Sequence, residues 1–158
     1  MSRATAWTSH VGAALVAATG IVYGWMRYFA EPADEFAVMN HPWQPEALAS
    51  HVVLAPLVVF ACGMLWPTHV VGRLRGGRPS RRRTGLVLAV LLGPMIFSGY
   101  LLQVSVEESW RATWMWTHLV TSVLWTVLYI VHQFLPDDPV DADPFAAFED
   151  DEFEPAAD

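Results

Sequence analysis

The feature that most constrains this chain is a set of four separate apolar stretches, at about residues 6–29, 47–72, 83–105 and 110–135. Each is near or above the roughly 18–20 residues that a helix needs to cross the hydrocarbon core of a bilayer. Hydrophobic residues make up 54% of the chain, and a soluble domain of 158 residues seldom contains four such stretches. The sequence therefore predicts an all-α integral membrane four-helix bundle over residues 1–135.

Basic residues orient the predicted helices. All nine are Arg, and six of them lie between Arg73 and Arg83, in the connection between the second and third stretches. By the positive-inside rule this connection is cytoplasmic. Four crossings then place both termini in the cytoplasm, which agrees with Arg3. We expect a multi-pass protein of the bacterial inner membrane in contact with lipid, and membrane topology accounts for the Arg cluster better than nucleic-acid binding does.

The composition changes after Pro136. Ten of the sixteen acidic residues follow Leu135, and residues 136–158 are poor in aliphatic side chains. Such a composition predicts a disordered, acidic tail on the cytoplasmic side. The tail is either a solubilising extension or, through the three phenylalanines among its acids, a docking motif for a partner. Upstream, the single cysteine, Cys62, is expected to be a small buried residue.

The last apolar stretch carries two histidines, His118 and His132, which are fourteen residues apart. On a helix this separation is roughly 21 Å, and the two imidazoles face the same side to within about 40°. The predicted topology places His118 toward the outer surface and His132 toward the cytoplasm. By the same argument His51 lies near the outer end of the second helix and His10 near the cytoplasmic end of the first. Two pairs are therefore predicted, with His69 as a third candidate at the inner end.

Paired histidines in membrane helices indicate a functional site, because polar side chains are costly there. Zinc prefers four ligands that usually include Cys or carboxylate, and neither pair has these at its depth. Two opposed imidazoles suit haem, whose macrocycle leaves two axial positions on the iron. Gly20, Gly24 and Gly99 would let two haem groups lie flat against a helix, although close helix packing is the alternative reason for glycine. Arg73 lies where it would neutralise a haem propionate.

The order and spacing of the histidines resemble those of membrane di-haem cytochrome b subunits. One histidine opens the first helix, one lies early in the second, none is in the third, and two lie fourteen residues apart in the fourth. The chain is most similar to the gamma subunit of respiratory formate dehydrogenase and its relatives in hydrogenases and thiosulfate reductases. The resemblance covers roughly residues 5–135. It extends to the strings His10-Val11-Gly12 through Thr19-Gly20, Arg82-Arg83-Thr84-Gly85 and Phe97-Ser98-Gly99-Tyr100.

This resemblance implies that two haem b groups are bound, each between two histidines. Carried over by position, His51 and His118 would ligate the outer iron, and His10 and His132 the inner iron. The pairs agree with those predicted from depth alone.

The resemblance also implies quinone chemistry near the inner haem, where this chain has His69 and Arg73. Because His69 lies beyond Pro67 at the interface, we expect it to bind a quinone carbonyl or a propionate, and inner ligation by His69 in place of His10 is the alternative. The expected function is electron transfer between a quinone pool and a redox partner subunit or cytochrome. The chain would serve as a subunit of a membrane oxidoreductase, and no catalytic residue is assigned.

Three other functions stay open on the same residues. Only one pair of histidines would bind haem in a mono-haem cytochrome b. A haem-free transporter or assembly subunit would use the histidines to relay protons or to bind metal ions. A plain membrane anchor would have its activity in the acidic tail.

Overall fold

The computed structural model describes residues 3–75 and 81–135, and this part of the chain is helical and contains no strand. Its elements are, in chain order, α1 (Arg3–Tyr28), α2 (Gln44–Leu65), the π-helical turn η1 (Trp66–Val71), α3 (Gly72–Arg75), α4 (Arg82–Val104) and α5 (Glu108–Phe134). Because α2, η1 and α3 follow one another without a break, the described residues form four long helices. All four are long enough and apolar enough to cross a membrane.

The prediction of an all-helical fold with four apolar helices is confirmed for these residues. Each long helix matches a predicted stretch and begins one to three residues earlier than the apolar pattern indicates. The acidic tail predicted for residues 136–158 lies outside the described residues.

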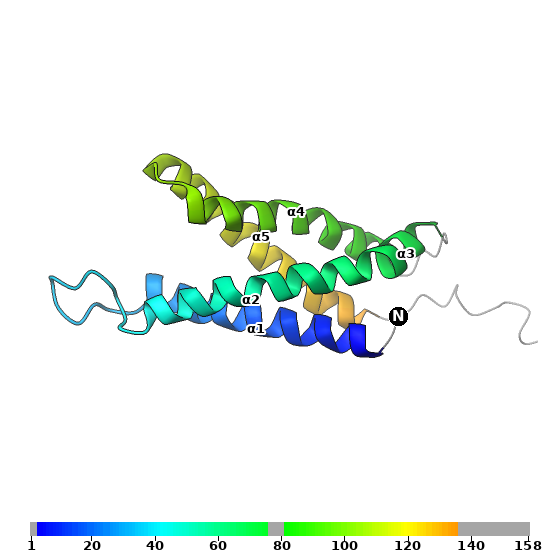
Figure 1. Cartoon of the computed structure of the whole chain (residues 1–158), viewed down its shortest axis with the longest axis horizontal. Coiled ribbons are helices and arrows are strands. Elements are labelled where there is room, and N and C mark those ends of the chain that lie inside the picture. Colours follow the sequence, from blue (N-terminus) through cyan, green and yellow to red (C-terminus); the bar gives the residue numbers. More distant parts are fainter. Residues whose placement is uncertain (1–2, 76–80, 136–158) are drawn as a thin grey trace, which may run out of the picture.

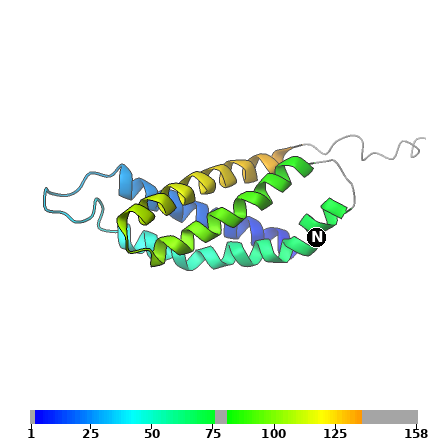
Figure 2. The ribbon, with the colours of Figure 1, turned by 90° about the horizontal axis from the view of Figure 1, so that it is seen from above.

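The four helices form two hairpins, an N-terminal hairpin of α1 with α2 and a C-terminal hairpin of α4 with α5 (Figure 1). Within each hairpin the two helices approach each other closely along their length. Between the hairpins, repeated backbone approach in the described part is confined to α4 and η1. All four helices follow the same long axis (Figure 2). The hairpins are therefore joined mainly through side chains.

The two hairpin connections lie at the same end of the molecule (Figure 1). The connection between α4 and α5 is only residues 105–107. The Arg111 guanidinium donates to the carbonyl oxygen of Ser105 at 3.1 Å, so it satisfies an acceptor left over at the end of α4. The connection between α1 and α2 is longer, and the Asn40 side-chain amide ties it back by donating to the carbonyl oxygen of Arg27 at 2.9 Å.

The second long helix widens into a π-helical turn at Trp66. Pro67 lies in the first turn of this segment. Proline has no N–H group to donate, and its ring clashes with the carbonyl group four residues earlier, so a regular α-helix cannot pass through it undisturbed. The chain responds by widening one turn and then continues as helix to Arg75, beyond the predicted end of the apolar stretch.

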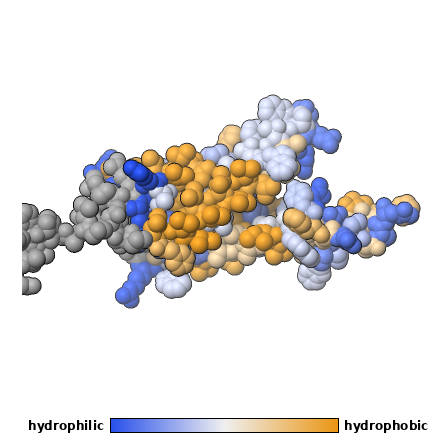
Figure 3. Space-filling view, turned by 180° about the vertical axis from the view of Figure 1, so that it is seen from behind, coloured by the Kyte–Doolittle hydropathy of each residue, from blue (hydrophilic) through white to orange (hydrophobic). Residues whose placement is uncertain are grey.

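Large apolar side chains face outward along the middle of the helices. Val53, Phe60 and Phe97 are 73%, 65% and 64% exposed. The buried core is small and centres on Val58 of α2 and Trp125 of α5. Figure 3 shows the result as an apolar band between more hydrophilic ends. Exposed apolar surface of this extent is typical of contact with lipid and suggests a multi-pass membrane protein.

Candidate functional site

Two histidines from different hairpins face each other near the connected end of the molecule. The ring centroids of His51 on α2 and His118 on α5 are 6.2 Å apart, and the ring planes meet at 75°. We call these two residues the outer pair. They are the two histidines that sequence spacing and predicted depth assigned to one site, and the structure brings them together.

Main-chain carbonyl groups hold both rings of the outer pair. Nδ1 of His51 lies 3.1 Å from the carbonyl oxygen of Val16, and Nδ1 of His118 lies 2.9 Å from that of Met95. A carbonyl oxygen only accepts hydrogen bonds, so each Nδ1 carries the proton and donates it. Nε2 is then the unprotonated nitrogen of each ring and is the atom available as a ligand to a metal ion.

Each ring of the outer pair lies against a glycine, which belongs to the other helix of the same hairpin. A Cβ atom added to Gly20 would lie 2.9 Å from Cε1 of His51, and one added to Gly99 would lie 3.0 Å from Cε1 of His118. In both cases Nε2 is the most distant of the three contacting ring atoms, at 3.8 and 3.9 Å. The two glycines therefore let the rings approach α1 and α4 closely while Nε2 stays the atom farthest from the glycine.

The residue before each glycine has a hydroxyl group beside the same ring. The Thr19 hydroxyl lies 3.3 Å from Nδ1 of His51, and the Ser98 hydroxyl lies 3.5 Å from Nδ1 of His118. We call this arrangement, a Ser or Thr followed by Gly against a histidine of the adjacent helix, a hydroxyl–glycine seat. The outer pair has one seat in each hairpin, with nearly the same distances.

A second pair of histidines lies at the opposite end of the helices. The ring centroids of His69 on η1 and His132 on α5 are also 6.2 Å apart, and their planes meet at 90°. We call these residues the inner pair. Each pair therefore joins the N-terminal hairpin to α5, and the two pairs share one ring-to-ring distance.

His132 has a third hydroxyl–glycine seat. Nδ1 of His132 lies 2.8 Å from the hydroxyl oxygen of Thr84, and a Cβ atom on Gly85 would lie 3.5 Å from Cε1 of the ring. The Thr84 hydroxyl donates its single proton to the carbonyl oxygen of Arg81 at 3.0 Å. Its oxygen is therefore the acceptor toward His132, so Nδ1 again carries the proton and Nε2 does not.

His10, which the sequence paired with His132, has a different neighbour. Nδ1 of His10 lies 2.7 Å from the hydroxyl oxygen of Tyr129, one turn from His132 on α5. The position opposite His132 is taken by His69, because the π-helical turn lets the second helix continue past Pro67 to the inner end. The structure thus brings together the alternative inner pair and not the one that the sequence favoured.

Gly24, the third glycine predicted to face a cofactor, has open space beside it. A Cβ atom at this position would meet no atom within 4 Å, so Gly24 contacts no histidine.

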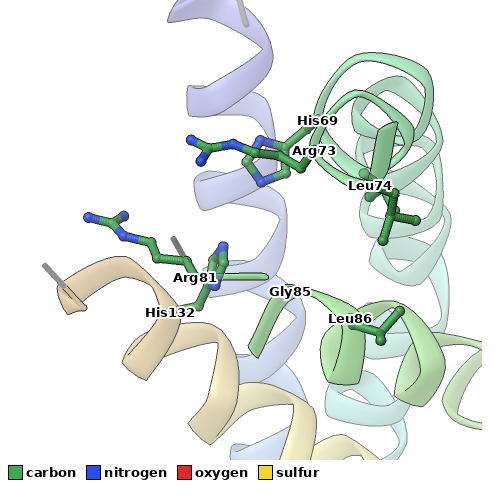
Figure 4. A pocket seen from close by; sticks show the side chains of 8 residues that line it. His69, Arg73, Leu74, Arg81, Gly85, Leu86 and His132 are labelled. Atoms are coloured by element: carbon green, nitrogen blue, oxygen red, sulfur yellow. The ribbon is translucent and has the colours of Figure 1, made fainter. Parts of the chain in front are cut away.

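A partly open cavity of about 90 Å³ lies beside the inner pair. Both histidines of the pair line it, together with Val70, Arg73, Leu74, Arg81, Gly85 and Leu86. In Figure 4 the side chains of Arg73 and Arg81 extend to the same side of the two imidazoles. The predicted inner-end residues His69 and Arg73 are therefore in one site, which offers two cationic groups to an anion.

The spacing of both pairs fits two imidazoles on one metal ion. With metal–nitrogen bonds of roughly 2.0 Å and ring centres about 1 Å behind the nitrogens, opposed imidazole centroids are roughly 6 Å apart. No three His, Cys, Asp or Glu side chains of the described residues form a group that would bind a metal ion unaided. A pair of imidazoles suits a metal whose remaining ligands come from a macrocycle, so the residues present fit haem at both pairs.

The hydroxyl–glycine seats were not predicted from the sequence, although the spacing of two of them is visible there. Thr84-Gly85 and Ser98-Gly99 are fourteen residues apart, the same spacing as the two histidines that they contact on α5. The contact between Gly20 and His51 is not part of this fourteen-residue repeat, so residue spacing gives no sign of it.

Comparisons with protein-family models, with curated proteins and with solved structures give no match for this chain. The site is therefore interpreted from its own geometry.

Proposed function

We propose that this chain is a membrane-spanning cytochrome b that transfers electrons through two haem groups, one held by the outer pair and one by the inner pair. The observation that carries the proposal is the repeated geometry. Two pairs of histidines, each with one member in either hairpin, have the same centroid distance of 6.2 Å. In three of the four rings Nδ1 is hydrogen-bonded to an oxygen atom. A single pair would be an ordinary polar contact, whereas two equal pairs on one helix fit a chain of redox centres.

The membrane orientation of the proposal follows from charge. The inner pair lies at the end of the molecule that contains Arg73, Arg75 and Arg81, and by the positive-inside rule this end is cytoplasmic. Both termini then lie in the cytoplasm of a bacterial cell, and the outer pair lies toward the opposite face of the inner membrane.

The residues of the chain bind, orient and shield the cofactors. Main-chain carbonyls at His51 and His118, and the Thr84 hydroxyl at His132, hold each imidazole in the tautomer that leaves Nε2 free. Such partners of metal-ligating histidines also raise ligand basicity. Arg73 and Arg81 are placed to pair with the propionates of the inner haem. When bound, haem supplies reversible one-electron redox chemistry.

Helix α5 sets the distance between the two centres. His118 and His132 are fourteen residues apart on one unbroken helix, which is roughly 21 Å. Trp125 lies midway between them and stacks on Tyr129 at a centroid distance of 5.0 Å. Trp125 is buried and Tyr129 is half-buried, so an aromatic pair lies on α5 between the two histidines.

The partners of the electron transfer are proposed from the resemblance in histidine order. A quinone is the proposed partner at the inner end, near His69 and Arg73, and a redox subunit or soluble cytochrome is the proposed partner at the outer end. The cavity that His69 and Arg73 line lies at the end proposed for the quinone.

The proposal is tested by counting haem in the purified protein with the pyridine haemochrome assay. We expect two haem b per chain and low-spin spectra. His118→Ala should remove the outer haem only, and His69→Ala should change the low-spin spectrum of the inner haem by removing one of its two ligands, whereas His10→Ala should leave both haems unchanged. A colourless protein would refute the function, and loss of the inner haem in His10→Ala but not in His69→Ala would refute the inner pair.

A further inference from the structure

His69 differs from the other three paired histidines in how its ring is held. His51, His118 and His132 each have an oxygen within 3.1 Å of Nδ1 and a glycine against the ring. Within residues 3–75 and 81–135, no hydrogen bond reaches the His69 ring and no glycine lies against it. A net hydrogen bond corresponds to roughly two- to tenfold in an equilibrium constant, so His69 is the least restrained of the four imidazoles.

The backbone that carries His69 is also the irregular one. His51 lies in the interior of α2, and His118 and His132 lie in α5, all in regular α-helix. His69 lies in the π-helical turn η1. Such a turn is rare and is frequent at functional sites. The backbone at His69 is therefore less regular than the backbone at the other three paired histidines.

The surroundings of His69 give it room to move. The cavity of about 90 Å³ lies beside its ring, and Figure 4 shows His69 among the side chains that line it. His69 is half-buried, and its neighbours Trp66, Pro67 and Thr68 are exposed. At the outer pair both rings are instead held in seats against their own hairpins.

From these three observations we infer that His69 is an exchangeable ligand and that the inner centre binds small external donors in its place. The class of ligand is a small neutral molecule with one donor atom, of which CO is the simplest probe. In the exchange, the bond from the metal to Nε2 of His69 breaks and the bond to the external donor forms. No electron is transferred, and His132 stays bound. The inference rests on the proposed function and adds a binding site to it.

The first experiment adds CO to the purified full-length protein after reduction with dithionite. We expect one of the two haems to give a CO difference spectrum. In His118→Ala and His51→Ala, which should each retain only the inner haem, all of the remaining haem should bind CO. Binding of CO to both haems, to neither, or to the outer haem alone would overturn the inference. Two low-spin haems that do not bind CO would refute the inference but not the proposed function. A protein without haem would refute both the inference and the proposed function.

The second experiment identifies the ligand that leaves. If CO replaces His69, the C–O stretching frequency of the wild-type complex should equal that of His69→Ala, because both then have His132 opposite the CO. His132→Ala is the matched control and should give a different frequency or no complex. A wild-type frequency equal to that of His132→Ala, or equal in both variants, would overturn the inference. If both variants lose the inner haem, the wild-type measurement of the first experiment decides alone.

Discussion

Gly20→Ala tests the hydroxyl–glycine seat most directly. The new Cβ atom would lie 2.9 Å from Cε1 and 3.2 Å from Nδ1 of His51. Carbon atoms in contact are ordinarily about 3.5–4.0 Å apart, so the ring must move by at least about 0.6 Å. Nδ1 lies 3.1 Å from the carbonyl oxygen of Val16, and a shift of this size away from α1 takes the hydrogen bond beyond its usual length.

The magnitude follows from two losses. Forcing a methyl group into a filled space costs about 1–3 kcal/mol, and the lost hydrogen bond costs about 1 kcal/mol more. A total of at least about 2 kcal/mol corresponds to roughly thirtyfold weaker binding at the outer pair. The inner pair does not contact Gly20. We therefore expect the variant to lose most of its outer haem and to keep its inner haem.

Gly24→Ala is the matched control, since it places the same methyl group one turn further along α1 with no atom within 4 Å. The measurements are haem per chain by pyridine haemochrome, followed by a redox titration that resolves the two centres. Equal haem content and equal outer potentials in Gly20→Ala and Gly24→Ala would refute the reasoning, because they would show that the ring of His51 does not depend on the space beside Gly20.

Three further substitutions test the remaining contacts. Gly99→Ala should deplete the outer haem as Gly20→Ala does, because its Cβ meets a ring atom at 3.0 Å, whereas Gly85→Ala, at 3.5 Å, should keep the inner haem; equal losses would contradict the distances. Thr84→Val removes the acceptor of the inner imidazole, so the ligand becomes less basic and the inner reduction potential should rise by up to roughly 40 mV in a redox titration; an unchanged potential would contradict this role. Tyr129→Phe removes a hydrogen bond between the hairpins and should lower thermal stability by about 1 kcal/mol while both haems remain; loss of the inner haem would instead favour a ligand role for His10.

The four helices were predictable because membrane-spanning length and apolarity depend on local composition alone. The outer pair was predictable for a related reason. His51 and His118 lie near the connected ends of regular helices, so depth and helical periodicity were sufficient to place them opposite each other.

The inner pair was not predictable by the same argument, because periodicity fails at Pro67. A count of residues per turn assumes a straight α-helix, and η1, which begins three residues before His69, breaks that assumption. The choice between His10 and His69 depends on how α1 and the π-helical turn face α5, which is a property of three helices together. The seats were hidden for a similar reason, since each joins a dipeptide on one helix to a histidine on another.

The same contacts explain what joins the two hairpins. Helices in lipid are not driven together by burial of apolar surface, because the lipid is equally apolar. Apart from η1 and α4, the described hairpins make little backbone contact, and the hydrogen bond between the His10 and Tyr129 side chains links them. Metal bridges through His51 with His118 and through His69 with His132 would each tie the N-terminal hairpin to α5. Because binding energy of this kind is also folding energy, the proposed cofactors complete the bundle as well as its function. The restrained ligands would then be His118 and His132 on α5 and His51 on α2, and the exchangeable one would be His69 on the π-helical turn.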